Sequence, residues 1–463
     1  MTLPQPVGRQ REVVALPPEG HFVVLGTAGS GKTTMAVHRA AHLGDPRTDH
    51  AGPTLLLTFN RALLAYFEHF GASGLANVTV QNYHAFARGY LGARDAMGWN
   101  WIVRTEERRR RFLRDALHSV RANHGSAGVL ARDEEFFFSE LMYAAQHGFL
   151  ARAEYLVADR VGRGTALDRT GRERVFDVQD AYVALRAEQG FRYDWYDIAY
   201  HARAQFELDD SPRMYRHIVI DEGQDFSPEM LRSLALAIPA DGSLTYFGDV
   251  AQQIYGRGIS WRRAGLNVSS VWRFEHNYRN TPEIASLGLA IAAMPYFRDQ
   301  PDMVAPTGFR ASGPPPTLVR LNDTAAETAF VIQQARAAAA TDSVGILLTR
   351  HEDERRFAQE FNGAQRLHRD LTNWQGGPGV SYGTVHSAKG FEFDTVILVG
   401  VTDDRWPEPM AIDGDGLEEA TAVGGRLLYV AVTRARQNLI MTATGDLTEL
   451  LPTQEGLWTA LRR

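Results

Sequence analysis

A glycine-rich run near the start of the chain has the residue types and spacing needed to bind phosphate. Residues 26–33 read GTAGSGKT, directly after the apolar run 21–26 and before a helix-patterned stretch from 32 to 43. Backbone N–H groups and the N-terminus of a helix would cradle phosphates. Lys32 would reach the β and γ oxygens and Thr33 would hold Mg²⁺. The run predicts a site for the phosphates of a nucleotide with its magnesium ion.

Two adjacent carboxylates end a second apolar run. Residues 216–221 read RHIVID, and Glu222 follows. At the end of a buried strand, Asp221 would bind on the Mg²⁺ side of the site, and Glu222 could polarise an attacking water molecule. An apolar strand ending in Asp-Glu is by itself often only a strand and its loop, so the pair gains its meaning from the phosphate-binding run.

Lysine is almost absent from this sequence. The chain has 49 Lys and Arg residues, and Lys32 and Lys389 are its only lysines. In such a background, the two lysines should mark places where a compact ammonium is needed and a planar guanidinium does not serve. Lys389 precedes Gly390 and would contact phosphate or hold its loop against the first lobe; an ordinary exposed lysine is the alternative.

The run from Asp221 to Asp225, DEGQD, resembles the second motif of superfamily 1 helicases of the UvrD/Rep/PcrA type, with Gly223 where the family commonly has alanine. Further motifs of that family follow in its order. They are Gln10, Thr58-Phe-Asn60, Tyr83-His84, the run 248–255 (GDVAQQIY), Asn277-Tyr-Arg279, the run 384–392 (TVHSAKGFE) and the run 429–436 (YVAVTRAR). The resemblance extends over nearly the whole chain.

The resemblance implies an ATP site that two lobes complete. Gln10 would read adenine, Tyr278 would stack on it and Gln252 would sense the γ-phosphate, while Arg279 and Arg434 would act as arginine fingers. The catalytic residues implied are Lys32, Glu222, Gln252, Arg279 and Arg434, and the metal ligands are Thr33 and Asp221. The ATP-binding residues implied are Gln10, Gly26, Thr27, Ala28, Gly29, Ser30, Gly31, Lys32, Thr33, Thr34, Tyr278, Arg279, Gly390, Glu392 and Arg434.

Five aromatic residues are candidates for contact with a nucleic-acid strand, because aromatic faces stack on bases without reading sequence: Phe59, Tyr83, His84, Tyr255 and His386. The resemblance adds Asn60, which belongs to the same motif as Phe59. Core packing is the alternative for Phe59 and Tyr83. Arginines 108–111 could follow a phosphate backbone, or form a solvated helix face paired with Glu106 and Glu107.

The elements that position these residues are short apolar strands alternating with helices, which indicates parallel α/β sheets. Strands are expected at 21–26, 53–58, 77–80, 216–221, 244–249, 317–321, 344–349, 395–400 and 438–443. The resemblance implies two RecA-like P-loop NTPase lobes: domain 1A at 1–88 and 206–274, a helical domain 1B at 89–205, and domain 2A at 275–463. The short interval between Arg279 and His386 predicts that domain 2B of larger relatives is absent or vestigial, with 351–378 as the candidate vestige.

Composition excludes several other kinds of protein. The chain has 463 residues, 44% of them hydrophobic, so it can bury a sizeable core. It has no cysteine, which excludes disulfides, thiolate metal sites and cysteine nucleophiles. The net charge of −6 excludes a uniformly basic protein but allows a local basic groove. No secretory signal or membrane span is visible, so a cytoplasmic protein with no membrane partner is expected.

The expected function is an ATP-dependent helicase or translocase that moves 3′→5′ on single-stranded DNA, with ATP and Mg²⁺ as cofactors. RNA remains open as the strand, and a nuclease or repair factor as a protein partner. The alternative is a regulatory, DNA-sensing NTPase subunit of a larger complex, for example a phage-defence assembly with a nuclease.

Overall fold

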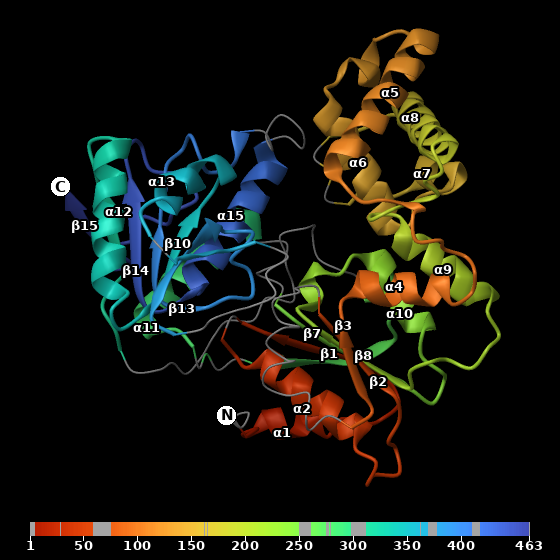
Figure 1. Cartoon of the computed structure of the whole chain (residues 1–463), viewed down its shortest axis with the longest axis horizontal. Coiled ribbons are helices and arrows are strands. Elements are labelled where there is room, and N and C mark those ends of the chain that lie inside the picture. Colours follow the sequence, from red (N-terminus) through yellow and green to blue (C-terminus); the bar gives the residue numbers. More distant parts are fainter. Residues whose placement is uncertain are drawn as a thin grey trace.

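The computed structural model describes residues 5–27, 29–58, 76–161, 163, 165–249, 261–274, 277, 279–297, 312–361, 363–368, 377–409 and 417–462. These residues form two sheet-containing lobes and a helical lobe that projects from the first (Figure 1).

The first lobe is built on a parallel sheet. Within the described ranges the sheet has six strands in the order β3-β2-β6-β7-β1-β8. The strands are β1 (Gly20–Gly26), β2 (Thr54–Thr58), β3 (Val78–Gln81), β6 (His217–Asp221), β7 (Ser243–Gly248) and β8 (Val268–Phe274). Helices α1 (Arg9–Val14) and α2 (Lys32–Gly44) cover one face, while α4 (Tyr83–Gly92), α9 (Ile198–Leu208) and α10 (Pro228–Leu236) cover the other (Figure 1).

Alternation along the strands builds a core on each face of this sheet. Leu55 and Leu57 pack in the cluster under α4, α9 and α10, whereas Leu56 packs in the cluster under α1 and α2. Ile218 and Ile220 likewise lie opposite Val219. Successive side chains of a strand point to opposite faces, so an uninterrupted apolar run indicates a sheet covered on both sides.

The helical lobe has a core of its own. It contains α5 (Glu106–His124), α6 (Glu134–His147), α7 (Arg152–Val157) and α8 (Arg169–Glu188), and two short paired strands, β4 (Ile102–Val103) and β5 (Tyr193–Asp194), lie at its base. Thr105, Asp133 and Asp168 cap the starts of α5, α6 and α8 by accepting backbone N–H groups. Tyr90 and Ala202, which the expected boundaries assign to domain 1B, pack in the core of the first lobe.

The second lobe repeats the parallel architecture. Its described strands have the order β11-β12-β10-β13-β14-β9-β15. They are β9 (Thr317–Arg320), β10 (Ser343–Leu348), β11 (Gln365–Arg366), β12 (Gly379–Thr384), β13 (Phe393–Leu398), β14 (Ala435–Ala443) and β15 (Thr459–Arg462). Helices α11 (Pro282–Ala292) and α15 (Leu417–Thr433) pack with one core cluster, and α12 (Thr324–Ala338) and α13 (Arg355–Ala358) with the other.

The expected fold class, two parallel-sheet lobes with a helical insertion in the first, is confirmed. Between β10 and β12 the described residues form a single turn, the short helix α13 and the two-residue strand β11, which joins the sheet. Among the described helices none is long and apolar enough to cross a membrane.

Candidate functional site

The glycine-rich loop connects β1 to α2 at the carboxyl edge of the first sheet. Gly31, with φ +85°, ends the loop and α2 begins at Lys32. Lys32 is 8% exposed, and its Nζ donates to the carbonyl oxygens of Gly26 (2.9 Å) and Thr27 (2.7 Å). Burial lowers the pKa of Lys32, and Asp249, 4.0 Å away, opposes this. The lysine therefore bonds to the loop that phosphates would occupy.

A residue of the second lobe lies directly against this loop. A Cβ atom on Gly29, which has φ +80°, would lie 2.3 Å from Cβ of Arg279 and 2.5 Å from Oδ1 of Asn277. Only glycine fits there. On the other side, Gln10 Nε2 donates to the carbonyl oxygen of Ser30 at 3.3 Å. The loop is thus held between the N-terminal segment and the second lobe. Thr33 and Thr34 follow in the first turn of α2, both half-buried.

Asp221 ends β6 as a buried carboxylate. It is 1% exposed, and neither of its side-chain oxygens has a hydrogen-bond partner among the described residues. Burial and the neighbouring Glu222 raise its pKa to about 7, while Thr33 acts in the opposite direction. An unsatisfied, buried carboxylate beside a threonine of the phosphate loop fits a magnesium ligand set, which usually combines one or two carboxylates with waters and phosphate oxygens.

Glu222 is in a different electrostatic position from its neighbour. Burial would raise its pKa, but Lys32, Lys389 and Arg434 outweigh burial and lower it. Glu222 also has φ +50°, an uncommon conformation for a residue with a side chain. One carboxylate of the pair is thus biased toward its protonated form and the other toward its ionised form, which is the form that accepts a proton from water.

Gln224 connects Glu222 with the end of the neighbouring strand. Its Nε2 donates to Glu222 Oε2, and its Oε1 accepts the N–H of Asp249 at 2.9 Å. A Cβ on Gly223 would lie 2.2 Å from the ring of Tyr246, a buried residue of β7. The bulk of Tyr246 therefore explains why this chain has Gly223 at a position where the family that it resembles commonly has alanine.

Two arginines of the second lobe reach the same site. Arg434 is 1% exposed, and its guanidinium donates to the carbonyl oxygens of Val430 and Phe391. Burial, with repulsion from Arg279, lowers its pKa to about 10, whereas Glu222 raises it. Arg279 forms an ion pair with Glu392, which also accepts a hydrogen bond from Arg436. This charge pairing lies within the second lobe, and Arg279 meets the first lobe through its packing on Gly29.

An asparagine pair fixes the segment that carries Arg279. Asn277 Oδ1 accepts the backbone N–H of Arg279 at 2.9 Å, and Asn277 Nδ2 donates to Asn280 Oδ1 at 2.9 Å. Asn280 in turn donates to the carbonyl oxygens of Thr433 and Ala435, on either side of Arg434. Both arginines are thereby held at fixed positions relative to each other.

Lys389 forms an ion pair with Asp225 of the first lobe. This is the second of its expected roles, holding the loop against the first lobe. Gly390 follows with φ +87°. The Lys389–Asp225 ion pair can form only while the two lobes are in contact. Its presence therefore indicates that the lobes are closed on each other.

The residues expected to touch a nucleic-acid strand divide into three groups. Tyr83 is a correction: it is fully buried, its hydroxyl lies 2.7 Å from Ser233 Oγ and its ring packs edge-on against Phe226, so it is a core residue that no base can reach. His84 is half-buried against Trp195, and His386 is half-buried between β12 and β13. The remaining expectations lie outside the described residues, together with three of the ATP-site expectations: Phe59, Asn60, Tyr255, Ala28, Gln252 and Tyr278.

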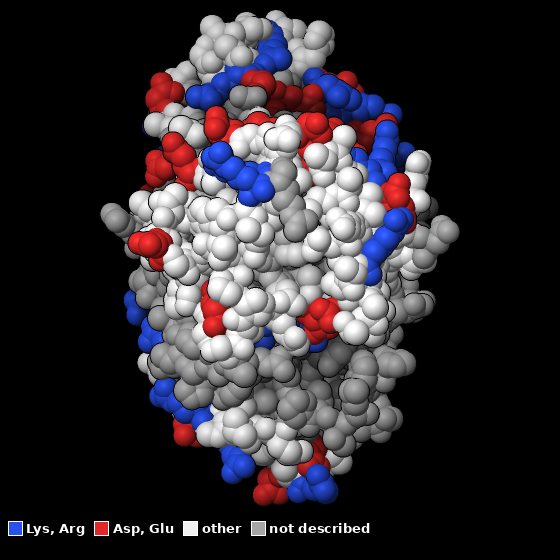
Figure 2. All heavy atoms as spheres, turned by 90° about the vertical axis from the view of Figure 1, so that its left-hand side faces the viewer, with Lys and Arg blue, Asp and Glu red and all other residues white. Residues whose placement is uncertain are grey.

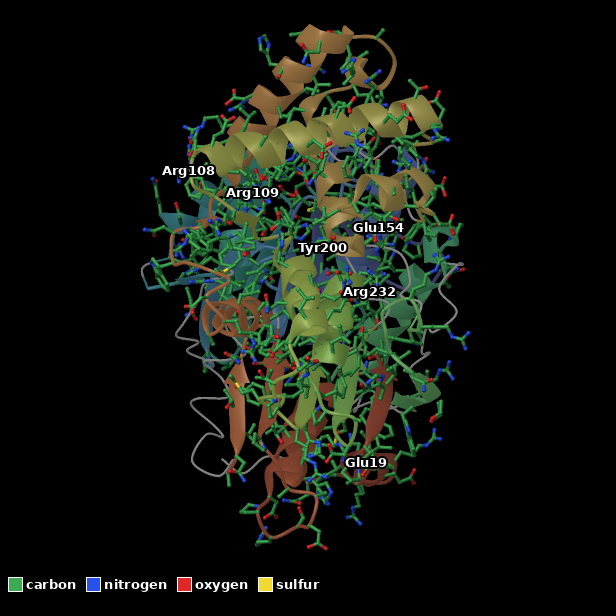
Figure 3. All side chains as sticks on the ribbon, turned by 90° about the vertical axis from the view of Figure 1, so that its right-hand side faces the viewer. Glu19, Arg108, Arg109, Glu154, Tyr200 and Arg232 are labelled. Carbon is green, nitrogen blue, oxygen red and sulfur yellow. The ribbon has the colours of Figure 1, made fainter. Side chains whose placement is uncertain are left out.

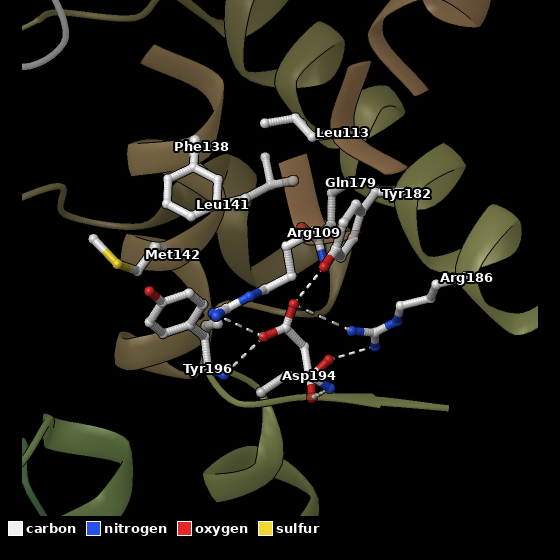
Figure 4. Close-up of a pocket in the computed structure, with 12 residues that line it drawn as sticks. Arg109, Leu113, Phe138, Leu141, Met142, Gln179, Tyr182, Arg186, Asp194 and Tyr196 are labelled. Atoms are coloured by element: carbon white, nitrogen blue, oxygen red, sulfur yellow. Dashed lines mark hydrogen bonds and ion pairs between the residues drawn. The ribbon is translucent and has the colours of Figure 1, made fainter. Parts of the chain in front are cut away.

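A second buried charge cluster lies in the helical lobe (Figure 4). Asp194 Oδ1 is 3.7 Å from Arg109 and accepts the N–H of Tyr196, and its other oxygen accepts the hydroxyl of Tyr182. Arg186 forms an ion pair with Asp197. The cavity beside them is about 30 Å³, room for a water molecule but not for a nucleotide.

Residue type and spacing alone give no role to several residues beside the phosphate loop and the carboxylate pair: Gln224, Asp225, Asp249, Asn277 and Asn280. Each stands within a few positions of a residue that was assigned, in the runs 221–225, 244–249 and 277–280. Their residue types are the feature of the sequence that points to a role, because short carboxylates and amides beside catalytic groups usually orient those groups. Among the described residues no group of three or more His, Asp or Glu could hold a metal ion, so Mg²⁺ would rely on Thr33, Asp221 and the nucleotide.

Comparison with known proteins gives matches over most of the chain. Residues 7–278 match the UvrD/REP helicase N-terminal domain, and residues 364–446 match the UvrD-like helicase C-terminal domain. The chain is 28% identical over 346 residues to the ATP-dependent DNA helicase UvrD2 of Mycobacterium tuberculosis, covering 70% of this chain and 48% of that protein.

Two further relatives match shorter stretches. The ATP-dependent DNA helicase PcrA of Leuconostoc citreum is 24% identical over 57% of this chain and 34% of its own length. DNA helicase II of Escherichia coli is 46% identical over 70 residues, 15% of this chain and 9% of its own. The chain spans about half or less of the length of these curated relatives. Its phosphate loop, paired carboxylates and Arg434 lie within the two matched domains, and the chain belongs to the UvrD/REP family of helicases.

Proposed function

We propose that this chain is an ATP-hydrolysing motor that moves 3′→5′ along single-stranded DNA, as a translocase or helicase. One observation carries the proposal. Lys32, Asp221 and Glu222 of the first lobe share one buried electrostatic cluster with Arg279 and Arg434 of the second. A nucleotide in that cluster would be held by groups from both sheets, so binding and hydrolysis change the contact between the lobes.

The chemistry follows from the positions of the side chains. Backbone N–H groups of the glycine-rich loop and Lys32 would bind the phosphates, in place of the loop carbonyls that Lys32 now contacts. Mg²⁺, when bound through Thr33 and Asp221, would neutralise charge on the β and γ phosphates. Glu222 would accept a proton from the water that attacks the γ-phosphorus, and the bond to the ADP oxygen would break. Arg279 and Arg434 would stabilise the charge on the transferred group.

Coupling to movement would use the contacts between the lobes. Lys389 of the second lobe pairs with Asp225 of the first. Arg279 packs on Gly29 of the first lobe while it pairs with Glu392 of its own lobe. A γ-phosphate would compete with Glu392 for Arg279 and would thereby alter how Arg279 packs against the phosphate loop of the first lobe. Each ATP cycle would thus close and reopen the cleft, and a strand bound across both lobes would move with it.

The first experiment measures the ATPase rate without nucleic acid and with single-stranded DNA, duplex DNA and single-stranded RNA, at low and high salt. A motor that grips a phosphate backbone is stimulated strongly by single-stranded DNA, and high salt removes the stimulation. Equal stimulation of the ATPase rate by single-stranded RNA would extend the proposed substrate to RNA as well as DNA. ATP binding without stimulation by any strand would contradict the motor and indicate a regulatory switch that acts with a protein partner, such as a nuclease or repair factor.

A further inference from the structure

A cavity of about 200 Å³ lies in the first lobe, between α4 and the end of α9. Aromatic rings form its walls. Tyr90 and Phe206 stack with ring centroids 3.6 Å apart, and Phe86 packs near both Phe206 and Tyr215. Figure 3 shows the side of the first lobe where α9, which carries Tyr200, lies below the helical lobe. We call this space the Tyr215 cavity. Its ring-lined wall favours an apolar or aromatic occupant.

The Tyr215 cavity lies away from the phosphate loop. Gln81, in its lining, belongs to β3, the outermost described strand at that side of the sheet, whereas the loop follows β1, with β2, β6 and β7 between them. Tyr215 stands two residues before β6, at the amino edge of the sheet, and Asp221 ends the same strand at the carboxyl edge. The nucleotide chemistry therefore does not account for this cavity.

Two polar groups of the cavity wall have unused hydrogen-bonding capacity. Tyr215 is 8% exposed, and its hydroxyl has no hydrogen-bond partner among the described residues. Arg94 donates from Nε to Asp209, and its terminal Nη atoms have no hydrogen-bond partner within the described ranges. The two Nη atoms form a flat fork that matches the oxygens of a carboxylate. A polar side chain that the protein buries and leaves unsatisfied indicates that something else completes it.

A glycine keeps the mouth of the cavity open. Gly89 lies inside α4 and lines the cavity. Glycine in a helix interior is less favourable than alanine. No backbone requirement explains it here, because Gly89 is not among the glycines with positive φ and a Cβ atom added to it would meet no atom within 4 Å. This glycine weakens α4, and its structural effect is to leave space in front of the cavity.

Exposed apolar side chains lie beside the cavity. Met214, which lines it, is 58% exposed, and Leu208, two residues after Phe206, is 80% exposed. Apolar side chains gathered around a cavity are typical of interaction sites, and methionine adapts to differently shaped partners. The outer face of the second lobe, over α12, differs: Figure 2 shows scattered charges of both signs among its described atoms, which select no particular partner.

We propose that the Tyr215 cavity binds an aromatic side chain of a partner protein, with a carboxylate beside that ring held by Arg94 and Tyr215. The volume fits one ring, since a cavity of about 150 Å³ binds benzene, whereas sites for whole small molecules usually have about 300–1,000 Å³. The carboxylate follows from the unused Nη fork on the same wall. Met214 and Leu208 would pack on the preceding residues of the partner.

A chain that ends in an aromatic residue carries a ring and a carboxylate on adjacent atoms of one residue, so it is the simplest segment with this chemistry. The test measures binding of the peptide Gly-Ser-Gly-Leu-Asp-Phe, with a para-fluorinated terminal ring, to the full chain by fluorine NMR. One buried ring and one charged contact predict a Kd on the order of 0.1–1 mM. Amidation of the terminal carboxylate should weaken binding by about 10- to 100-fold.

Gly89→Leu is the decisive variant, because it fills the mouth of the cavity without a clash and replaces a poor helix former with a good one. It should remove peptide binding and leave the chain at least as stable to heat. The matched control is Gly92→Leu, the same change in the same helix outside the cavity lining, which should bind the peptide as the parent chain does.

Two further variants test the polar contacts. Tyr215→Phe removes only the hydroxyl and should weaken binding by about 2- to 10-fold. Arg94→Lys keeps the charge but loses the fork, so it should weaken binding of the peptide with a free carboxylate and leave binding of the amidated peptide unchanged. Equal losses for both peptides would show that Arg94 only shapes the cavity and would overturn its assigned contact.

Several results would overturn the proposal. They are the absence of saturable peptide binding to the parent chain at millimolar concentration, and equal binding by Gly89→Leu and the parent chain. Free hydrocinnamate, which has the ring and the carboxylate alone, should bind about fivefold more weakly than the peptide, because it lacks the leucine that would pack on Met214 and Leu208. Equal affinity would make the cavity a site for a small aromatic acid instead. The ATPase rate with single-stranded DNA should be the same in Gly89→Leu and the parent chain, so failure of this proposal is distinguishable from failure of the motor.

Discussion

The nucleotide cleft and the helical lobe each bury a cluster of charged side chains, but the two clusters differ in what completes them. In the helical lobe, Asp194 accepts hydrogen bonds from Tyr182 and Tyr196, and Arg186 pairs with Asp197. In the cleft, Asp221 is just as buried and has no hydrogen bond among the described residues. A buried carboxylate left unsatisfied by the protein indicates a ligand, whereas a satisfied one indicates structure.

The clusters also differ in where their members come from. Arg109, Asp194 and Arg186 belong to α5, β5 and α8 of one lobe with its own core. The cleft joins Lys32 and Glu222 of one sheet to Arg279 and Arg434 of another. Charged pairs inside one lobe stabilise the fold of that lobe. Charged groups that come from two lobes can change partners when the lobes move relative to each other. Mutations should therefore affect folding in the first case and chemistry in the second.

The largest expected effect is on hydrolysis in Arg434→Ala. An arginine that stabilises the transferred phosphoryl group contributes about 10³- to 10⁵-fold in rate, so kcat should fall by that order with little change in nucleotide affinity. Steady-state ATPase assays and equilibrium nucleotide binding measure the two quantities. Because Arg434 is buried, Arg434→Lys serves as a second variant that keeps the charge. Arg436→Ala, which removes a 41% exposed side chain, is the control and should have a much smaller effect. An unchanged rate in Arg434→Ala would remove this residue from the site.

Glu222→Gln should lower hydrolysis by about 10²- to 10⁴-fold and keep ATP binding, because the amide has the same shape but cannot accept the proton from water. Single-turnover hydrolysis with radiolabelled ATP separates binding from chemistry. Rapid steady hydrolysis by this variant would show that another group acts as the base.

The helical lobe should respond in the opposite way. Arg186→Met leaves Asp197 buried without its cation, and breaking a buried pair costs about 3–5 kcal/mol of unfolding free energy. Denaturant unfolding measures the loss, and the ATPase rate per folded molecule should stay the same. Arg169→Met, which breaks an exposed pair with Glu173, is the control and should cost about 0.3–0.5 kcal/mol. A slower ATPase with unchanged stability would mean that this cluster takes part in the reaction.

The smallest expected effect is a pH dependence of magnesium binding. The pKa of Asp221 is raised to about 7, so below that pH a proton occupies the carboxylate proposed to hold the ion. Magnesium affinity, measured with a non-hydrolysable nucleotide, should rise about tenfold per pH unit up to about pH 7 and level off above it. Asp221→Asn should bind Mg²⁺ weakly at every pH. A flat profile in the parent chain would place the ion on other groups.

Much of the fold could be predicted from the sequence, because apolar runs of four to six residues between helix-patterned stretches are typical of buried parallel strands. The strands missed were β8, β12 and β15, together with the two-residue strands β4, β5 and β11. β8 reads VSSVWRF and is mostly half-buried or exposed, and β12 contains two glycines, so neither has the apolar run that marks the others. Their places in the sheets come from pairing with β1 and β10, which local sequence does not encode.

For the site, residue type and spacing by themselves determined the glycine-rich loop, its lysine and the carboxylate pair, since these stand close together in the chain and their chemistry depends on short spacing. The tertiary structure alone decided that Arg279 packs on Gly29, that Lys389 pairs with Asp225, and that Tyr83 is buried in the core. It also brought Trp99 and Trp195 together from distant segments. Each of these contacts joins residues far apart in the chain. Such contacts depend on how sheets and lobes pack, and burial, charge pairing and hydrogen bonding over the whole molecule settle that packing.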